Sequence, residues 1–175
     1  MTKTLVASVA LILCSIGSAN AQAQAPATTT RTTTIARDLS FRPLNGNIQI
    51  RMSDYENQTV VIVLWASWCP PCRLALTELT TMKRDSFANS PYPIIALSIE
   101  DPAKAEADLR QAVDIISFKE VIGWIDENAP LMEGRKSVPH VLIVKNLKVL
   151  KRYLGWHPKN VPEIKKLLTT ALKTR

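Results

Sequence analysis

An apolar run at residues 60–65 leads within four positions into the sequence Cys69-Pro70-Pro71-Cys72, and this junction constrains the fold more than any other segment. The run is uninterrupted and rich in β-branched residues, which predicts a central strand covered on both faces. The residues after it repeat at the spacing of one buried helical stripe: Cys72, Ala75, Leu76, Leu79 and Met82. We therefore predict a strand followed at once by a helix that ends near Asp85, with both cysteines at the junction.

The two cysteines are expected to take different roles because they occupy different positions on this helix. A thiol attacks a disulfide as the thiolate, and the free N–H groups and positive dipole end of a helix N-terminus stabilise that anion. Cys69 lies at that end and is predicted to be the accessible, attacking sulfur, whereas Cys72 starts the buried stripe and is predicted to resolve the mixed disulfide. Pro70 and Pro71 have no N–H, so the amides of Cys72 and Arg73 are the expected donors to the Cys69 sulfur.

A Cys-x-x-Cys pair is also half of a structural zinc site, which needs four ligands and usually a second Cys or His pair at short spacing. The remaining cysteine is Cys14, and the two histidines are His140 and His157. No second pair at short spacing exists, so the pattern favours a redox pair over zinc. Neither a metal nor another cofactor is expected.

The N-terminal residues have the pattern of an export signal. Lys3 supplies a positive start, residues 5–16 are apolar, and Ala19 and Ala21 mark a small-residue cleavage site. We predict a signal peptide at residues 1–21, cleaved after Ala21, and export to the periplasm. The apolar stretch is shorter than the roughly 20 residues that span a bilayer, so no stable membrane insertion is expected after cleavage.

The rest of the chain is expected to form one domain, because 175 residues with 46% hydrophobic content suffice for one core. Residues 22–37 are an Ala/Gln/Thr/Pro-rich flexible linker, and the domain occupies residues 38–175. Asn45-Gly46 predicts a tight β-hairpin turn between strands at 39–44 and 48–52. Further strands are predicted at 94–99, 121–125, 141–144 and 149–153, and further helices at 102–113, 127–133 and 160–172.

Two smaller features concern the C-terminal part of the chain. Asn160 and Glu163 resemble a capping box that opens the last helix. The formal net charge is +7, and from Lys145 onward nine basic residues face one acid, Glu163. We interpret this as a solvated basic face toward acidic partners or an anionic membrane surface. A nucleic-acid partner is not expected for an exported chain without a binding motif.

The predicted order of elements, the sequence Trp-Ala-Ser-Trp-Cys-Pro-Pro-Cys-Arg and the later Ser137-Val138-Pro139 together resemble the thioredoxin fold. Within it, the chain is most similar to exported thioredoxins of the TlpA/ResA type, from about Leu39 to the C-terminus. The resemblance implies an α/β fold with a central mixed β-sheet flanked by helices and an extra N-terminal β-hairpin. It also implies that Pro139 is cis and that Val138 lies beside Cys69, where a substrate peptide pairs as an added strand.

The resemblance further implies a thiol–disulfide oxidoreductase whose partners are client proteins with thiols or disulfides. Apocytochrome c or copper-site assembly proteins would be typical clients, which implies a role in cytochrome c biogenesis. A membrane electron donor of the DsbD/CcdA type would regenerate the reduced form. The expected substrate-binding residues around the two cysteines are Trp68, Pro70, Pro71, Val138 and Pro139.

The chain departs from the family at two acidic positions that are thought to relay a proton to the buried thiol. Val63 and Ala75 stand there, so a water molecule or the opposite thiol must take that role. Thr77 also replaces the helix-kinking proline of relatives. Without the acid, exchange in one direction is expected to be slower.

The residues around the cysteines also bear on the direction of exchange and on one alternative function. No histidine lies between the cysteines, which favours a reductase or isomerase role over strong oxidation. Val138 before the proline is instead similar to the oxidising Dsb-type enzymes. The rival is a copper-binding metallochaperone in which Cys69, Cys72 and His140 hold Cu(I), although strand alternation should turn His140 away from Pro139.

Overall fold

The computed structural model describes residues 34–173 apart from 36, 38, 47 and 91. The chain divides into units at residues 1–30 and 31–175. The signal peptide predicted at 1–21, and most of the linker predicted at 22–37, therefore lie outside the described residues. No helix in the described part is long and apolar enough to cross a membrane.

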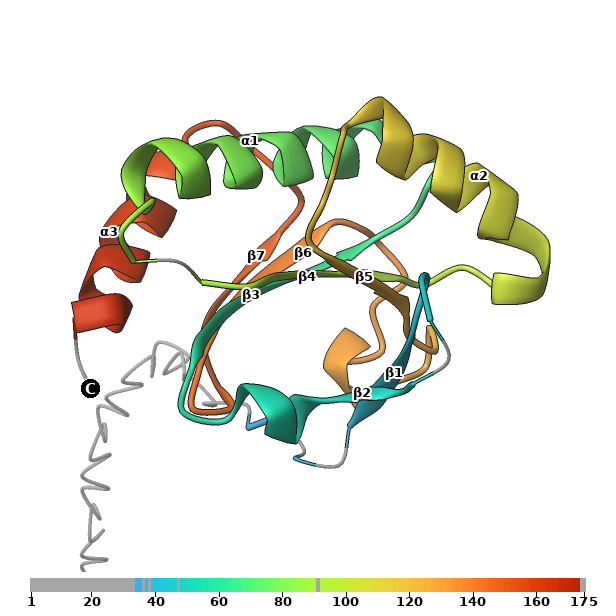
Figure 1. Ribbon diagram of the computed structural model, residues 1–175, viewed down its shortest axis with the longest axis horizontal. Coiled ribbons are helices and arrows are strands. Elements are labelled where there is room, and N and C mark those ends of the chain that lie inside the picture. Colours follow the sequence, from blue (N-terminus) through green and yellow to red (C-terminus); the bar gives the residue numbers. More distant parts are fainter. Residues whose placement is uncertain (1–33, 36, 38, 47, 91, 174–175) are drawn as a thin grey trace, which may run out of the picture. The chain divides into compact units, whose positions relative to one another are not determined.

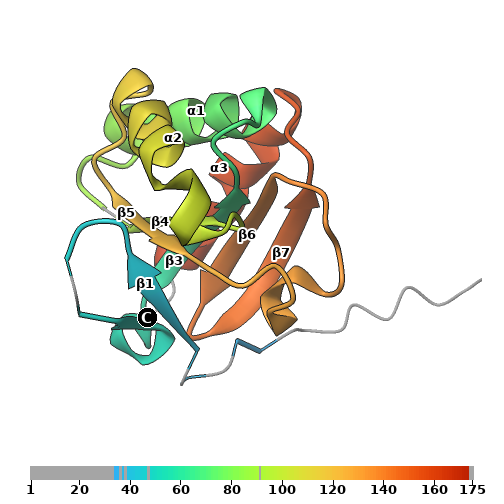
Figure 2. The same ribbon diagram turned by 90° about the vertical axis from the view of Figure 1, so that its right-hand side faces the viewer.

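The described residues form one sheet with three α-helices and two short 3-10 helices (Figures 1 and 2). The strands are β1 (Ser40–Pro43), β2 (Ile50–Arg51), β3 (Thr59–Trp65), β4 (Ile94–Ser98), β5 (Val121–Trp124), β6 (His140–Lys145) and β7 (Lys148–Leu154). The helices are η1 (Met52–Tyr55), α1 (Pro70–Ser86), α2 (Pro102–Ile115), η2 (Pro130–Met132) and α3 (Asn160–Lys173).

The sheet is mixed, with the strand order β2-β1-β5-β4-β3-β6-β7. β3, β4 and β5 run parallel, and β6 pairs antiparallel with β3. Parallel neighbours end at the same edge of a sheet, so the loops after β3, β4 and β5 gather at one place. The cysteine helix α1 starts from this edge.

Two apolar layers cover the sheet, as the alternation of strand side chains requires. One layer contains Val61, Val63 and Trp65 of β3 and packs against α1, α2 and α3. The other contains Ile62 and Leu64 of the same strand and packs against the N-terminal hairpin region, η1 and η2. Every residue of β3 is buried, which confirms the prediction of a central strand. The predicted α/β class with a central mixed sheet is also confirmed.

The predicted N-terminal hairpin is present, but its tight turn is not. β1 and β2 pair antiparallel, with Ser40 opposite Arg51. The connection between them spans residues 44–49, so the strands are shorter than predicted. Gly46 does adopt a positive φ of 101°. Ile48 is 85% exposed, so no packing holds this part of the connection in a strand.

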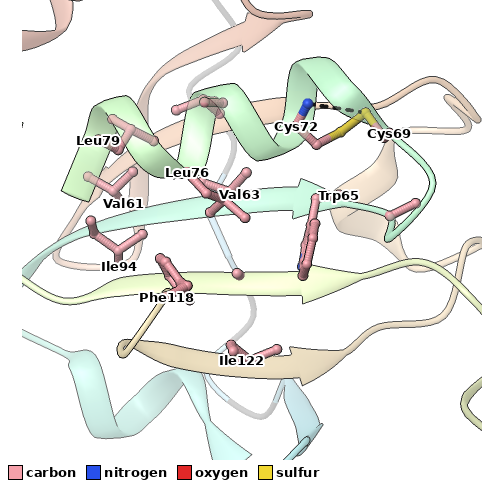
Figure 3. Packing of buried hydrophobic residues seen from close by; sticks show 14 of the residues in the cluster. Val61, Val63, Trp65, Cys69, Cys72, Leu76, Leu79, Ile94, Phe118 and Ile122 are labelled. Carbon is pink, nitrogen blue, oxygen red and sulfur yellow. Dashed lines mark hydrogen bonds between the residues drawn. A yellow bond between two sulfur atoms is a disulfide. The ribbon is translucent and has the colours of Figure 1, made fainter. Parts of the chain in front are cut away.

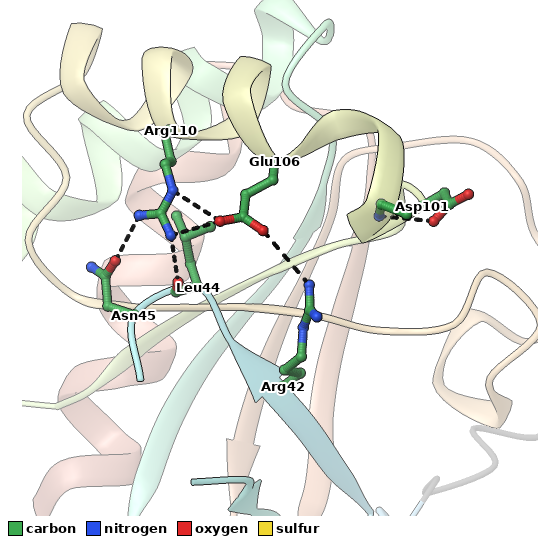
Figure 4. Close-up of polar contacts among 7 residues, drawn as sticks. Arg42, Leu44, Asn45, Asp101, Glu106 and Arg110 are labelled. Atoms are coloured by element: carbon green, nitrogen blue, oxygen red, sulfur yellow. Dashed lines mark hydrogen bonds and ion pairs between the residues drawn. The ribbon is translucent and has the colours of Figure 1, made fainter. Parts of the chain in front are cut away.

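Arg110 of α2 ties the start of this connection to the helix layer (Figure 4). Its guanidinium donates to the carbonyl oxygen of Leu44 at 3.0 Å and to Oδ1 of Asn45 at 2.9 Å. It also pairs with Glu106 at 2.8 Å, and Glu106 lies 4.0 Å from Arg42 of β1. Polar contacts thus replace the predicted two-residue turn in positioning the hairpin.

The helices follow the predictions except between β5 and β6. α1 runs uninterrupted over 17 residues with Thr77 in its middle, and α2 extends two residues past its predicted end. The helix predicted at 127–133 is only the three-residue η2. Pro130 lies in the middle of that predicted helix, and proline removes a backbone donor there.

At the C-terminal end, β6 and β7 form the predicted antiparallel pair with a two-residue connection. Asn146 and Leu147 both have positive φ, as this kind of turn requires. Leu147 also accepts a hydrogen bond from the Ile35 N–H at 2.7 Å, and Ile35 is buried. The packed domain therefore includes residue 35. Glu163 pairs with Lys151 of β7 instead of forming the predicted capping box.

Candidate functional site

The loop after β3 delivers Cys69 to the N-terminus of α1. Cys69 is the N-cap residue of this helix, with extended backbone angles of φ −101° and ψ 97°. Pro70 and Pro71 occupy the first turn, where their missing N–H groups break no helical hydrogen bond. The amide of Cys72 donates to the Cys69 sulfur at 3.3 Å. The amide of Arg73, the other expected donor, instead donates to the Cys69 carbonyl at 3.2 Å.

The two cysteines form a disulfide across this turn, with their Cα atoms 5.3 Å apart (Figure 3). Cys72 is fully buried, whereas Cys69 keeps 3% of its surface. Both cysteines are thus buried in this oxidised form. That Cys69 is the accessible, attacking sulfur stays a prediction for the reduced protein. The neighbouring Pro70 and Pro71 are exposed.

The segment before β6 forms the wall opposite the disulfide. The Val138–Pro139 peptide bond is cis, as the resemblance implied. The Val138 carbonyl oxygen lies 3.8 Å from the Cys69 sulfur. The Pro139 carbonyl in turn accepts a hydrogen bond from the Gly155 N–H at 2.8 Å, which ties this segment to the end of β7. Residues 69 positions apart in the chain are thus brought into contact.

Trp68 borders the site on another side, and its side chain is 64% exposed. The exposed indole presents a large apolar surface next to the disulfide. Trp65, three residues earlier, is fully buried in the core. The site therefore combines a nearly buried disulfide with an exposed indole, two exposed prolines and the Val138 backbone.

The space behind the disulfide is apolar. Val63 and Ala75 hold the positions where relatives carry acids, and both are fully buried in the layer beneath α1 (Figure 3 labels Val63). No carboxylate from either position can therefore exchange a proton with the Cys72 thiol.

One carboxylate that the sequence analysis missed does contact the redox loop. Glu100, just after β4, accepts the Ser67 N–H at 2.7 Å and the Ser67 hydroxyl at 2.8 Å. It also accepts the Ser98 hydroxyl at 3.0 Å. The only sequence signal for this contact is that polar residues follow β4 at the edge where β3 also ends.

His140, the third ligand of the copper alternative, does not join the cysteines. It is fully buried on β6, and its neighbours Val141 and Leu142 pack in opposite layers. Alternation places His140 with Leu142, on the face opposite α1. Among the residues that the structure describes, no group of three or more His, Cys, Asp or Glu side chains is placed to hold a metal ion. The three-ligand Cu(I) site is therefore wrong.

The buried His140 instead contacts charged neighbours. Its Nδ1 lies 3.1 Å from the Arg152 guanidinium, which can only donate, so Nδ1 accepts. Burial is the main cause that lowers the pKa of His140 to about 4, and the positive charges of Arg152 and Arg135 lower it further. Glu133, which pairs with Arg152 at 3.2 Å, acts in the opposite direction. The imidazole is neutral at pH 7.

Comparison with known proteins identifies the family. The model of the AhpC/TSA family matches residues 24–131, which is more than half of the chain. The chain belongs to the AhpC/TSA family. This AhpC/TSA member is 25% identical over 96 residues to an uncharacterized protein of Haemophilus influenzae. That match covers 55% of this chain and 61% of the relative's length.

Solved structures of other proteins share the fold. A Chlorobium tepidum protein assigned as the thiol:disulfide interchange protein DsbE is 22% identical, with a TM-score of 0.68, and the match covers 81% of this AhpC/TSA chain and 97% of that one. A secreted disulfide oxidoreductase of Mycobacterium tuberculosis, homologous to Escherichia coli DsbE, is 10% identical, with a TM-score of 0.57 and coverages of 79% and 96%. These likenesses establish the thioredoxin-like fold.

Proposed function

We propose that this chain is a thiol–disulfide oxidoreductase that exchanges disulfides with client proteins through Cys69 and Cys72. The observation that carries the proposal is the Cys69–Cys72 disulfide at the N-terminus of α1, with a backbone amide 3.3 Å from the Cys69 sulfur. The Val138 carbonyl, 3.8 Å from the same sulfur, offers a backbone acceptor to an extended client chain. The folds of the DsbE-like structures support the same activity.

The exchange proceeds by two attacks at sulfur. In the reduced protein, the Cys69 thiolate attacks one sulfur of a client disulfide, which forms a mixed disulfide and releases the other client sulfur as a thiolate. Cys72, after losing its proton to water or to the released thiolate, then attacks Cys69. This step closes the Cys69–Cys72 bond and frees the second client thiol. Two electrons pass from the protein to the client, and the reverse sequence oxidises a client dithiol.

Trapping with Cys72→Ala tests these roles. Without Cys72 the mixed disulfide on Cys69 cannot be resolved, so clients should remain attached and be visible by mass under non-reducing conditions. A Cys69→Ala variant is the matched control and should trap none. Equal trapping by both variants, or none by either, would refute the assigned roles.

For the direction of exchange, we propose a reductase or isomerase role. Among the described residues, one amide, that of Cys72, donates to the Cys69 sulfur. With the same single donor in the reduced form, we expect moderate stabilisation of the thiolate. Equilibration with glutathione should give a potential between those of thioredoxin and protein disulfide isomerase, about −270 to −180 mV. A potential near about −120 mV, the value of the strong oxidant DsbA, would reject this role.

We further propose that the protein works in the periplasm, after cleavage behind Ala21, and receives electrons from a membrane donor of the DsbD/CcdA type. The similar Mycobacterium tuberculosis protein is itself secreted. The proposed clients are thiol or disulfide proteins such as apocytochrome c or copper-site assembly proteins. The exported chain should begin near Gln22, and its cysteines should become oxidised in cells that lack the donor. An intact Met1 would contradict cleavage of the signal peptide. Cysteines that stay reduced without the donor would contradict the proposed source of electrons.

A further inference from the structure

A groove of about 760 Å³ opens beside the disulfide, with Trp68 in its lining. The groove lies where the chain leaves β4 and β5, at the edge of the sheet from which α1 also starts. Trp68 directly precedes Cys69 in the chain, so a client residue close to the attacked cysteine can approach this groove. Trp68 therefore links the groove to the site of exchange.

The groove is acidic in a basic protein. Four carboxylates line it, from Glu100, Asp101, Asp126 and Glu127, against the single base Lys104. The whole chain has a formal net charge of +7. A negatively charged groove at the edge of a binding site favours partners with positively charged groups at that place.

Two of these carboxylates are already engaged, and two lack a basic partner. Glu100 accepts from Ser67 and Ser98, and Asp101 caps α2 and lies 3.4 Å from Lys104. Asp126 accepts only a backbone N–H, that of Asn128, at 2.7 Å. The exposed Glu127 has no hydrogen bond or ion pair within the described part of the chain. Asp126 and Glu127 therefore hold unneutralised charge.

Aromatic rings complete the lining. Trp124 is only 4% exposed, and its indole N–H is buried without an acceptor in the described structure. Trp68 is 64% exposed. A lysine or arginine stem packs well on such rings, and its cationic head is attracted to their faces. Arg42 already lies over the Trp124 ring, 5.9 Å from its centroid. The exposed Trp68 and the free carboxylates are therefore the features complementary to a further basic side chain.

We propose that the groove receives a lysine or arginine of the client polypeptide, within a few residues of the client cysteine that Cys69 attacks. Trp68 packs on the stem of this side chain, while Asp126 and Glu127 pair with its charge. The inference rests on the proposed exchange function and assigns it a substrate class, clients with a basic residue beside the disulfide.

Disulfide peptides that differ at one position next to the cysteine test this specificity. With Lys, Gln or Glu at that position, the reduced protein should give the highest kcat/KM for Lys and the lowest for Glu. The Lys peptide should exceed the Gln peptide by about three- to ten-fold, as two exposed ion pairs would produce. High salt should reduce this preference.

The variant Asp126→Asn with Glu127→Gln should abolish the preference. The new Asn keeps an oxygen acceptor for the Asn128 N–H, so the turn is preserved. The control variant Asp85→Asn with Asp114→Asn removes two exposed acids outside the groove lining and should keep the preference.

Hydroxyethyl disulfide, which is small and uncharged, separates the two proposals. If the native protein fails to exchange with it or with any peptide, the proposed function fails. If it exchanges but treats the Lys and Gln peptides alike, or if the groove variant keeps the preference, only the groove proposal is overturned. A native dimer that dissociates in the groove variant would assign the groove to a second copy of the chain and would also overturn it.

Discussion

Glu100 links the redox loop to the sheet through a single side chain. Its carboxylate accepts two hydrogen bonds from Ser67 and one from Ser98. Ser67 and Glu100 are 33 positions apart, so their contact depends on β3 and β4 ending at the same edge. The sequence predicted both strands but gave no indication of which side chains would meet beyond them. Cys69 and Cys72 were predictable because the motif and the helical stripe are local.

Replacing Glu100 with alanine should destabilise the fold. The change leaves the N–H of the buried Ser67 without its acceptor. The loss lowers the free energy of unfolding by about 1–3 kcal/mol. Urea denaturation measures this loss. The exposed Asp114→Ala serves as control and should change stability by less than about 0.5 kcal/mol. Equal effects of both changes would show that Glu100 does not anchor the loop.

His140 should make the stability of the protein depend on pH. Its pKa in the folded protein is about 4, against an ordinary value of 6.5, so between these values the unfolded chain binds a proton that the folded protein does not. The free energy of unfolding should therefore fall as the pH drops from about 6.5 to about 4, by about 2–4 kcal/mol. The stabilising contribution is complete above pH 6.5.

A His140→Gln variant isolates this contribution, because glutamine does not titrate and keeps an acceptor for Arg152. Urea denaturation between pH 7 and pH 4 should show a smaller loss of stability for the variant than for the native protein. Parallel losses would mean that other groups, and not His140, cause the pH dependence.

At the scale of elements, the hairpin docks on the sheet through β1 and β5, and this contact requires a residue without a side chain. Gly123 of β5 pairs with Pro43 of β1. A Cβ atom on Gly123 would lie 2.7 Å from the Arg42 carbonyl oxygen and 2.8 Å from a ring carbon of Phe41. Both distances are shorter than van der Waals contact allows.

Gly123→Ala should therefore push β1 away from β5 and lower the free energy of unfolding by about 1–3 kcal/mol. Gly134→Ala is the comparison, since a Cβ there meets nothing within 4 Å and only the positive φ of 70° opposes it. Denaturation of both variants should give the larger loss for Gly123. The reverse order would mean that β1 can shift at little cost.

The elements predicted from sequence were those with strong local patterns. Residues 60–65 and the cysteine helix have an unbroken apolar run and a clear stripe, and both elements lie within one or two residues of prediction. The turn at Asn45-Gly46 was misjudged because Arg110, 65 residues away from Asn45, positions that connection. The groove at the ends of β4 and β5 could not be predicted either. Its lining comes mainly from two segments at least 20 residues apart, which meet because the two strands are parallel and end at the same edge of the sheet.

At the scale of the whole molecule, the oxidised protein should be more stable than the reduced protein. The Cys69–Cys72 bond constrains the unfolded chain. The Cys72 amide already contacts the Cys69 sulfur at 3.3 Å in the oxidised form, so reduction does not add this contact. Strong oxidants owe their character to a stabilised reduced form. Urea denaturation with and without a reductant should show the oxidised form unfolding at higher urea. A more stable reduced form would favour an oxidase.

The most direct test of the central claim, that Cys69 is the attacking sulfur, is alkylation of the folded, reduced protein with iodoacetamide near neutral pH. Peptide mass mapping over time gives a separate rate for each cysteine. Cys69 should react at least about ten-fold faster than Cys72, because the helix N-terminus favours its thiolate and Cys72 is fully buried. Equal rates, or a faster Cys72, would contradict the proposed mechanism.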